Sequence, residues 1–418
     1  MTEQEKFVSC LYSAEQGDAA AQCQLGWMYY EGKGVVKDID KAMEWFRKSA
    51  EQEYADAQNS LGLIYHSGKE VTKNMAEAVK WYRKAAEQGD RSAQRNLGNC
   101  YYCGEGVPRD VLKAVKWWRK AAEQGNANAQ NILGSMYCNG EGVPRNYTEA
   151  MKWYLKAAEQ GEVNAPYNLG LMYEDGKGVA KNKAEAMKWY LKAAEQGHAV
   201  AQYIAGTLYY TGEGVPMDVV EAVKWWRKAA EQGYALAQNN LAYRYFEGKG
   251  VTRDVAEAVK WWQKAAEQGN VDAQCNLGIL YKTGTDTEKN VAEGIKWLQK
   301  AAEQGDVEAQ YQLAEIYRIG EDVTENYAEA AKWYRKAAIQ GHAVSQLILG
   351  TFYYNGWGVA KDLKKADILL KKASRDKEIG KNIANFVKKM QHPAAKNSPN
   401  VKTNDFLNFM LNSNSDKD

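Results

Sequence analysis

Two short motifs in this chain match parts of a catalytic site. Ser374-x-x-Lys377 and Lys282-Thr283-Gly284 are two of the three motifs that form the active site of serine β-lactamases and penicillin-binding proteins, in which the serine is the nucleophile. The third motif, Ser-Asp-Asn, is absent from the sequence. The tripeptide should also lie on a strand, whereas the pattern around it is helical. We interpret both matches as coincidental.

A second candidate is the redox-type pair Cys100-x-x-Cys103. A reactive thiolate is favoured at a helix N-terminus, where the helix dipole lowers the cysteine pKa. Here the pair lies where a helix is expected to end, and Cys100 occupies an apolar position that is Met28 and Met136 elsewhere in the chain. The six cysteines follow no periodic pattern that would predict disulfides. We therefore predict a structural role for this pair.

Neither the histidines nor the glycine-rich segments indicate a metal or cofactor site. The four histidines have no ligand-like spacing. The Gly-x-Gly-Val segments lack the third glycine and the Lys-Ser pair of a phosphate-binding loop, and their recurrence along the chain indicates that they end helices. The sequence predicts no catalytic residue, no metal and no cofactor, and we expect the protein not to be an enzyme.

The recurrence of these segments comes from a strict internal repeat. Between Ala19 and Lys372 the chain repeats ten times with a period of 36 residues and no insertion. One glycine marks every repeat: Gly32, Gly68, Gly104, Gly140, Gly176, Gly212, Gly248, Gly284, Gly320 and Gly356. Such strict periodicity is typical of a stacked array, in which each repeat buries its apolar face only against its neighbours.

Each repeat is predicted to be a hairpin of two helices. In the first repeat Leu25, Met28 and their apolar neighbours follow helical spacing, so a first helix is expected over roughly residues 19–31. It should end at Gly32, which can adopt a left-handed conformation. A second helix should begin after Asp38, because a short Asp or Asn side chain can accept the free N–H groups of its first turn. The second helix carries a recurring tryptophan: Trp45, Trp81, Trp117, Trp153, Trp189, Trp225, Trp261, Trp297 and Trp333.

This pattern predicts an all-α fold, an α/α superhelix (solenoid) of ten 36-residue helix–turn–helix repeats with helical caps. Residues 1–17 align with the second helix of a repeat and are expected to form a half-repeat cap, and residues 18–376 hold the ten repeats. Residues 377–391 are predicted to be a C-terminal capping helix whose apolar side chains are Ile379, Ile383, Phe386 and Val387. Residues 392–418 are rich in Asn, Ser and Lys and are expected to be disordered.

Composition limits the classes of partner. Lys and Arg number 55 against 53 Asp and Glu, so no basic surface large enough for nucleic acid is expected. No apolar run approaches the roughly 18 residues that a membrane span requires. The first residues lack the basic and apolar segments of a secretory signal, and we expect a cytoplasmic protein. Export by a route without an N-terminal signal stays open.

One face of the first helices differs from an ordinary solvated surface. Positions equivalent to Ala20, Cys23, Trp27 and Tyr30 point away from the core side of the first helix; we call them the inner face. They are rich in Tyr, Asn and Arg, which suit rigid aromatic contacts and adaptable hydrogen bonds with a peptide. The predicted binding residues are Asn59, Arg95, Asn99, Tyr102, Asn131, Tyr167, Tyr203, Tyr210, Asn239, Tyr243, Phe246, Tyr311 and Tyr354.

The repeat closely resembles the Sel1-like repeat, a relative of the tetratricopeptide repeats. The shared pattern is Ala-Gln-x-x-Leu-Gly-x-x-Tyr-x-x-Gly-x-Gly-Val, as in residues 129–143, followed by Asp/Asn-x-x-x-Ala-x-x-Trp-x-x-Lys-Ala-Ala-Glu-Gln-Gly. The resemblance covers almost the whole chain and implies a scaffold or adaptor for protein partners, often in bacteria. One branch of the family carries a cysteine pair in each repeat and is linked to β-lactam binding, and this chain lacks that pair. Pro166 departs from the pattern by replacing the glutamine of the fifth repeat.

The leading hypothesis is a non-enzymatic interaction scaffold that binds a peptide or protein loop in its concave groove. The first alternative is an exported effector that binds a host protein with the same groove, and the second is a hydrolase of the β-lactam-binding kind. The apolar residues 406–411 near the C-terminus add a candidate docking or export motif that folds on a partner. The sequence identifies neither the partner nor the oligomeric state.

Overall fold

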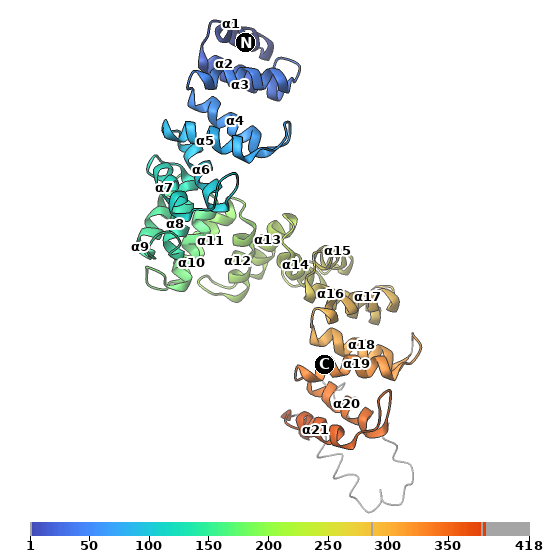
Figure 1. Ribbon diagram of the computed structural model, residues 1–418. Coiled ribbons are helices and arrows are strands. Elements are labelled where there is room, and N and C mark those ends of the chain that lie inside the picture. The colour runs from blue at the N-terminus through green and yellow to red at the C-terminus, as the bar shows by residue number, and fades with distance from the viewer. Residues whose placement is uncertain (1, 286, 321, 378, 382–418) are drawn as a thin grey trace, which may run out of the picture. The chain divides into compact units, whose positions relative to one another are not determined.

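The structure is a computed structural model that describes residues 2–285, 287–320, 322–377 and 379–381 (Figure 1). All regular secondary structure in these residues is helical, which confirms the predicted all-α repeat fold. Most of the predicted capping helix over 377–391, including Ile383, Phe386 and Val387, lies outside the described residues, as does the tail over 392–418. Within the described residues, no helix is long and apolar enough to cross a membrane.

The chain forms two compact units, Met1–Asp218 and Val219–Asp418, which we call the N-terminal and the C-terminal unit. In the N-terminal unit, α1 (Glu3–Glu15) precedes the first repeat. The first helices of its repeats are α2 (Ala19–Glu31), α4 (Ala55–Ser67), α6 (Arg91–Cys103), α8 (Ala127–Asn139), α10 (Asn164–Asp175) and α12 (Ala199–Thr211). The second helices are α3 (Ile39–Glu51), α5 (Met75–Glu87), α7 (Val111–Glu123), α9 (Tyr147–Glu159) and α11 (Lys183–Glu195).

The C-terminal unit has the same alternation of helices. Its second helices are α13 (Val219–Glu231), α15 (Val255–Glu267), α17 (Val291–Glu303), α19 (Tyr327–Ile339) and α21 (Leu363–Ala373). Its first helices are α14 (Ala235–Glu247), α16 (Val271–Thr283), α18 (Val307–Ile319) and α20 (Ala343–Asn355). The division of the chain into two units therefore falls inside the sixth repeat, between α12 and α13.

Local side-chain chemistry sets both ends of the helices, as the sequence predicts. Gly32 ends α2 with a φ of 75°, in the left-handed region, and its N–H bonds to the carbonyl of Met28. The carboxylate of Asp38 accepts the backbone N–H of Lys41 at 3.0 Å and caps α3. The same cap recurs with Asn74, Asp110, Asn146, Asn182, Asp254, Asn290, Asn326 and Asp362. A helix in each repeat thus starts at a residue that satisfies its free N–H groups.

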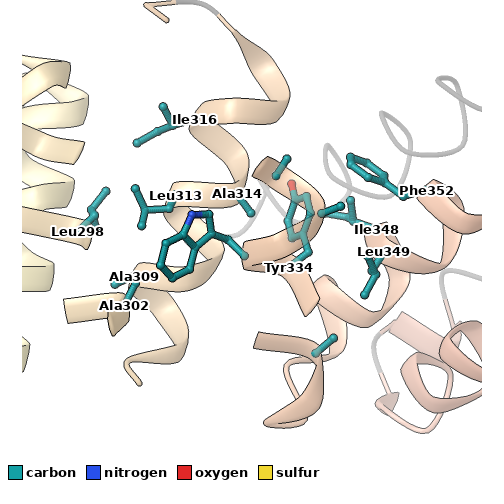
Figure 2. Close-up of a cluster of buried hydrophobic side chains, with 14 of the residues drawn as sticks. Leu298, Ala302, Ala309, Leu313, Ala314, Ile316, Tyr334, Ile348, Leu349 and Phe352 are labelled. Atoms are coloured by element: carbon teal, nitrogen blue, oxygen red, sulfur yellow. The ribbon is translucent and has the colours of Figure 1, made fainter. Parts of the chain in front are cut away.

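A buried ring from the second helix packs against a glycine of the first helix in each of the first five hairpins. A Cβ atom added to Gly62 would lie 2.5 Å from the ring of Tyr82, and one added to Gly98 would lie 2.5 Å from that of Trp118. The glycine is therefore required for the close approach of the two helices. In the C-terminal unit Tyr334 of α19 packs edge-on against Phe352 of α20, with ring centroids 5.6 Å apart (Figure 2).

The recurring tryptophan of the second helices is half-buried in the N-terminal unit and buried in the C-terminal unit, and a lysine follows it three residues later. The ammonium group of Lys48 lies 4.3 Å from the ring centroid of Trp45, which is only half-buried. Equivalent cation–π pairs, at 4.0 to 5.1 Å, join Trp81, Trp117, Trp153, Trp189, Trp225, Trp261, Trp297 and Trp333 to the lysine that follows each. The lysines that the sequence assigns to a plain solvated surface thus also cover aromatic rings.

In most repeats a buried glutamine of the first helix joins it to two second helices. In the fourth repeat, the amide of Gln130 donates to the carbonyl of Ala122 in α7 at 3.0 Å and accepts a hydrogen bond from Gln160 at the end of α9 at 2.6 Å. Gln130 is buried, so both polar ends of its side chain must find partners inside the protein. The glutamine–glutamine pair recurs at residues 52 and 22, 88 and 58, 124 and 94, 268 and 238, 304 and 274, and 340 and 310.

The fifth repeat lacks this pair because Pro166 occupies the place of the glutamine. Its first helix, α10, has 12 residues rather than 13. The carboxylate of Glu162, at the position of Asp18, Asp90 and Asn126 in other repeats, still caps this helix by accepting the N–H groups of Asn164 and Ala165 at 3.0 and 2.7 Å. Gln196 of this repeat therefore has no glutamine carbonyl to which it could donate.

This difference gives a matched test of the glutamine pair. We expect Gln160→Ala to lower the free energy of unfolding by about 1 to 3 kcal/mol, because it leaves the buried carbonyl of Gln130 without a donor. The control is Gln196→Ala, which removes the equivalent side chain opposite Pro166 and should cost less than about 0.5 kcal/mol. Urea unfolding followed by circular dichroism measures both, and equal losses in the two variants would contradict the assigned role.

Candidate functional site

The predicted binding residues lie on the first helices of both units. In the N-terminal unit they are Asn59 on α4, Arg95, Asn99 and Tyr102 on α6, Asn131 on α8, Tyr167 on α10, and Tyr203 and Tyr210 on α12. In the C-terminal unit they are Asn239, Tyr243 and Phe246 on α14, Tyr311 on α18 and Tyr354 on α20. Most are half-buried, Tyr210 and Tyr354 are exposed, and Asn239 is buried with 5% of its surface accessible.

A hollow opens on the inner face at the start of the N-terminal unit. It has a volume of about 560 Å³ and lies between α2, α4 and the start of α6. Ala20, Cys23, Trp27 and Asn59, which all belong to inner-face positions, contribute to its wall. The hollow also contains Leu63, a leucine with 38% of its surface exposed. The inner face is thus recessed and mixed in polarity at this point.

Some polar inner-face side chains form bonds between neighbouring repeats. The amide of Asn96 donates to the carbonyl oxygen of Asn59 at 3.1 Å. Asn168 makes the equivalent bond to Asn131 at 2.9 Å. In the C-terminal unit the hydroxyl of Tyr243 donates to Asn276 at 2.9 Å. These side chains fix the spacing of adjacent first helices, a role that the sequence pattern did not predict.

Other inner-face residues accept a hydrogen bond from the indole N–H of a tryptophan on a second helix. The indole N–H of Trp118 donates to Asn99 at 2.9 Å, and that of Trp262 donates to Asn239 at 3.1 Å. These bonds satisfy indole groups that would otherwise lose their hydrogen bonds to water on burial. Asn239 is therefore an internal partner of Trp262, and its burial differs from the exposure expected of a groove residue.

Two tyrosines of the inner face rest on histidines that cap the next first helix. The ring of Tyr167 stacks on His198 with centroids 4.6 Å apart, and Tyr311 packs on His342 with centroids 5.0 Å apart. The Nδ1 atom of His198 accepts the backbone N–H of Ala201 at 3.1 Å, at the start of α12. Burial lowers the pKa of His198 and of His342 below the ordinary value of 6.5, which favours the neutral ring that this cap needs. Sequence reasoning missed both caps, because the same position is Asp or Asn in other repeats.

The C-terminal unit carries a charged cluster on α18. The guanidinium of Arg318 donates to both carboxylate oxygens of Glu315, at 3.1 and 2.6 Å. The hydroxyl of Tyr334 from α19 also donates to Glu315, and Arg318 donates to that hydroxyl at 3.2 Å. Burial raises the pKa of Tyr334, so its hydroxyl keeps its proton. All these charges pair with one another, as buried charges must.

The chemically suggestive motifs lie in ordinary structural positions. Ser374 ends α21, and its hydroxyl donates to the carbonyl of Lys371. Lys282 lies in the last turn of α16 and donates to Gln312 at 2.6 Å. No strand is present in the described residues to carry Lys282-Thr283-Gly284 as a serine β-lactamase would. Ser374 therefore donates to a backbone carbonyl and not to a side chain that could act as its base.

The cysteines and histidines likewise form no reactive centre in the part of the chain that the structure describes. Cys100 is buried in α6, where burial raises its pKa to about 11, and Cys103 ends the same helix as an exposed residue. A thiol with a raised pKa is a poor nucleophile. No group of three or more metal-binding side chains lies together in the described residues.

The chain matches the model of a known repeat family along most of its length. The model of the Sel1 repeat family matches ten consecutive segments: residues 19–54, 55–90, 91–126, 127–162, 164–198, 199–234, 235–270, 271–306, 307–342 and 343–377. The fifth match begins one residue late, as α10 does. Together the matches cover nearly all of the described chain.

Two solved structures are similar over most of the chain. One is c5321, a protective antigen present in uropathogenic Escherichia coli strains that displays an SLR fold; it is 35% identical, with a TM-score of 0.67 over 98% of this chain and 94% of that one. The other is a Sel1 repeat protein from Oxalobacter formigenes, 35% identical, with a TM-score of 0.57 over 76% of this chain and 94% of that one.

A curated protein matches over a single repeat. The secretory immunoglobulin A-binding protein EsiB of Escherichia coli O6:H1, strain CFT073, is 47% identical over 36 residues. This match spans 9% of the present chain and 7% of that protein.

The histidine cap predicts a pH dependence of stability in the N-terminal unit. Because the pKa of His198 is lower in the folded than in the unfolded chain, the unfolded chain takes up a proton first as the pH falls below 6.5. The contribution of the cap is therefore present above that pH and is lost below it. We expect the loss of stability between about pH 7.5 and about pH 5 to be smaller in His198→Asn than in the unmodified protein, since Asn keeps the cap without titrating.

Asn126, which caps α8 at the same position of the repeat, shows that asparagine fits there. The other titratable groups are present in both proteins, so the difference between the two isolates the contribution that depends on His198, including its interaction with Glu162. Urea unfolding at the two pH values measures it, and parallel losses would contradict the assignment.

Proposed function

Because the chain belongs to the Sel1 repeat family, whose members are typically protein-interaction scaffolds, we propose that it is a non-enzymatic scaffold that binds a peptide or protein loop on its inner face. The observation that supports this most is the recess of about 560 Å³ between α2, α4 and α6, because it lies on inner-face positions and combines Trp27 and Leu63 with the amide of Asn59. Rigid aromatic and apolar groups beside adaptable polar ones are typical of peptide-binding surfaces.

The contacts within the structure divide the predicted binding residues into two groups. Asn99 and Asn239 receive indole N–H groups from the core, so we assign them to the support of the surface. Tyr210 and Tyr354, with 38% and 51% of their surface exposed, keep large areas that a partner can cover. Tyr167 and Tyr311 present half-buried rings already oriented by histidines, which limits the entropy lost on binding.

The test is to remove the tyrosine rings from both units. We expect Tyr167→Ala, Tyr203→Ala and Tyr311→Ala, combined in one chain, to lower the affinity for the native partner at least about a hundredfold, since buried interface tyrosines often contribute about 2 kcal/mol or more. Affinity purification from the native host with mass spectrometry identifies the partner, and titration of the purified pair measures the loss. The far-ultraviolet circular dichroism should stay helical.

The matched control removes two exposed lysines from second helices, Lys152→Ala and Lys188→Ala, whose side chains are 61% and 73% exposed. This variant should bind as the unmodified protein does. Equal partner lists and affinities for the unmodified and triple-tyrosine chains would refute the proposed surface.

A second proposal keeps the same surface but places the partner in a host. Its support is the similarity to a protective antigen of uropathogenic Escherichia coli and, over one repeat, to a secretory immunoglobulin A-binding protein. A cytoplasmic scaffold stays with the cell pellet when cultures are fractionated, whereas an exported binder is recovered from the medium or the cell surface.

A further inference from the structure

The second helix of the last repeat lacks the tryptophan that the second helices of the other nine repeats carry. At the position of the recurring tryptophan the tenth repeat has Leu369. Lys372 stands where the lysine covers that tryptophan in the nine preceding repeats, so it is the one member of this series that has no tryptophan beneath it. An ammonium group and an aromatic ring attract each other. The tenth repeat provides the ammonium group of Lys372 but no tryptophan ring for it to contact.

A hollow lies at this point of the C-terminal unit. Its volume is about 230 Å³, and Leu349, Leu369 and Ile368 from α20 and α21 line it together with Ala338 and Ile339 from α19. Ile339 and Ile368 are 79% and 53% exposed. In the other repeats the equivalents of Ile368 are Lys or Glu, and those of Ile339 are Glu in all eight preceding repeats.

The rim of the hollow carries three basic side chains, one of which, Lys365, also pairs with Asp362 at 3.1 Å. Arg335 donates to the hydroxyl of Tyr353 at 3.0 Å, the ammonium group of Lys365 lies 5.4 Å from the ring of the same tyrosine, and Lys372 completes the rim. An occupant that fits should therefore combine an aromatic ring with negative charge.

We propose that this hollow is the docking site of the chain's own segment 405–411, and that a phenylalanine of this segment, Phe406 or Phe409, lies beneath Lys372 in the place of the missing tryptophan. The segment reads Asp-Phe-Leu-Asn-Phe-Met-Leu, and residues 403–416 contain two Asp and no Lys or Arg. Its charge thus complements the rim, and its apolar side chains complement the wall.

The intervening chain is a poorer occupant. Residues 382–402 contain four lysines and no acidic residue, so their charge opposes that of the rim. Ile379 is buried against Leu347 and Ala373, on the side of α21 that carries Leu370 rather than Leu369. The 24 residues from 382 to 405 can span up to roughly 80 Å, so the later segment can reach the hollow.

Photo-crosslinking of the full chain tests the contact. With p-benzoylphenylalanine in place of Phe409, irradiation of a dilute sample should cross-link this position to α19 or α21 at residues 335–339 or 365–372, in a species with the mass of one chain. Cross-links from position 409 to another surface or to a second copy of the chain would overturn the proposal. So would cross-links to the hollow from p-benzoylphenylalanine at position 386 when none form from position 409.

Two substitutions give a variant that should fold normally yet lose the contact. Ile339→Glu with Ile368→Lys restores the residue types that other repeats carry at these positions, and it should lower the cross-link yield about tenfold, as a loss of about 1.4 kcal/mol would. The control is Ile319→Glu, the same kind of change at an exposed isoleucine that ends α18, away from the hollow, and it should leave the yield unchanged. An unchanged yield in the double variant would contradict the proposed site.

Discussion

The buried glutamine of the first helix is the contact on which the architecture most depends. A hairpin of two short helices cannot bury its apolar face alone, so its stability must come from the neighbouring hairpins. Gln130 makes this neighbour contact directional, because its amide must donate to Ala122 of one second helix and its carbonyl must accept from Gln160 of the next. Apolar packing tolerates small shifts, whereas a buried carboxamide with two fixed partners holds a single register. Where Pro166 removes this contact, the first helix itself starts later.

This constraint separates the positions that must repeat from those that are free to vary. The glycine that receives a ring, the asparagine or aspartate cap and the glutamine belong to the repeating framework. The inner-face positions vary widely in residue type, and their partners inside the protein vary with them: Trp118 pairs with Asn99, whereas Tyr334 pairs with Glu315. Variation on the inner face therefore reflects both recognition and the need to satisfy the polar tip of a buried ring.

The parts of the structure that follow from local chemistry were predictable from the sequence. Periodicity and cap residues predicted the bounds of α2 and placed the start of α3, because both depend on residues within a few positions of each helix end. Contacts between repeats were not predictable in the same way. The burial of Asn239 depends on Trp262, and the caps at His198 and His342 depend on tyrosines in the preceding repeat. The residue at a single position of the repeat does not reveal a partner in a neighbouring helix. The assignment of a binding role to the inner face stays a prediction.

Departures from a strict period carry information that the period itself does not. Pro166 marks a place where a framework contact is lost while the usual cap of the first helix is kept, because Glu162 accepts the N–H groups of Asn164 and Ala165. In the last two repeats the departures gather at one place: Leu369 replaces a ring, Ile339 of the ninth repeat and Ile368 of the tenth replace charged residues, and a hollow lies between them. Exposing apolar side chains to water costs free energy, and a concentration of them at one site indicates a binding surface. A repeat array can therefore bear two kinds of recognition surface: the variable inner face of the first helices, and the outer face where the last repeat departs from the others.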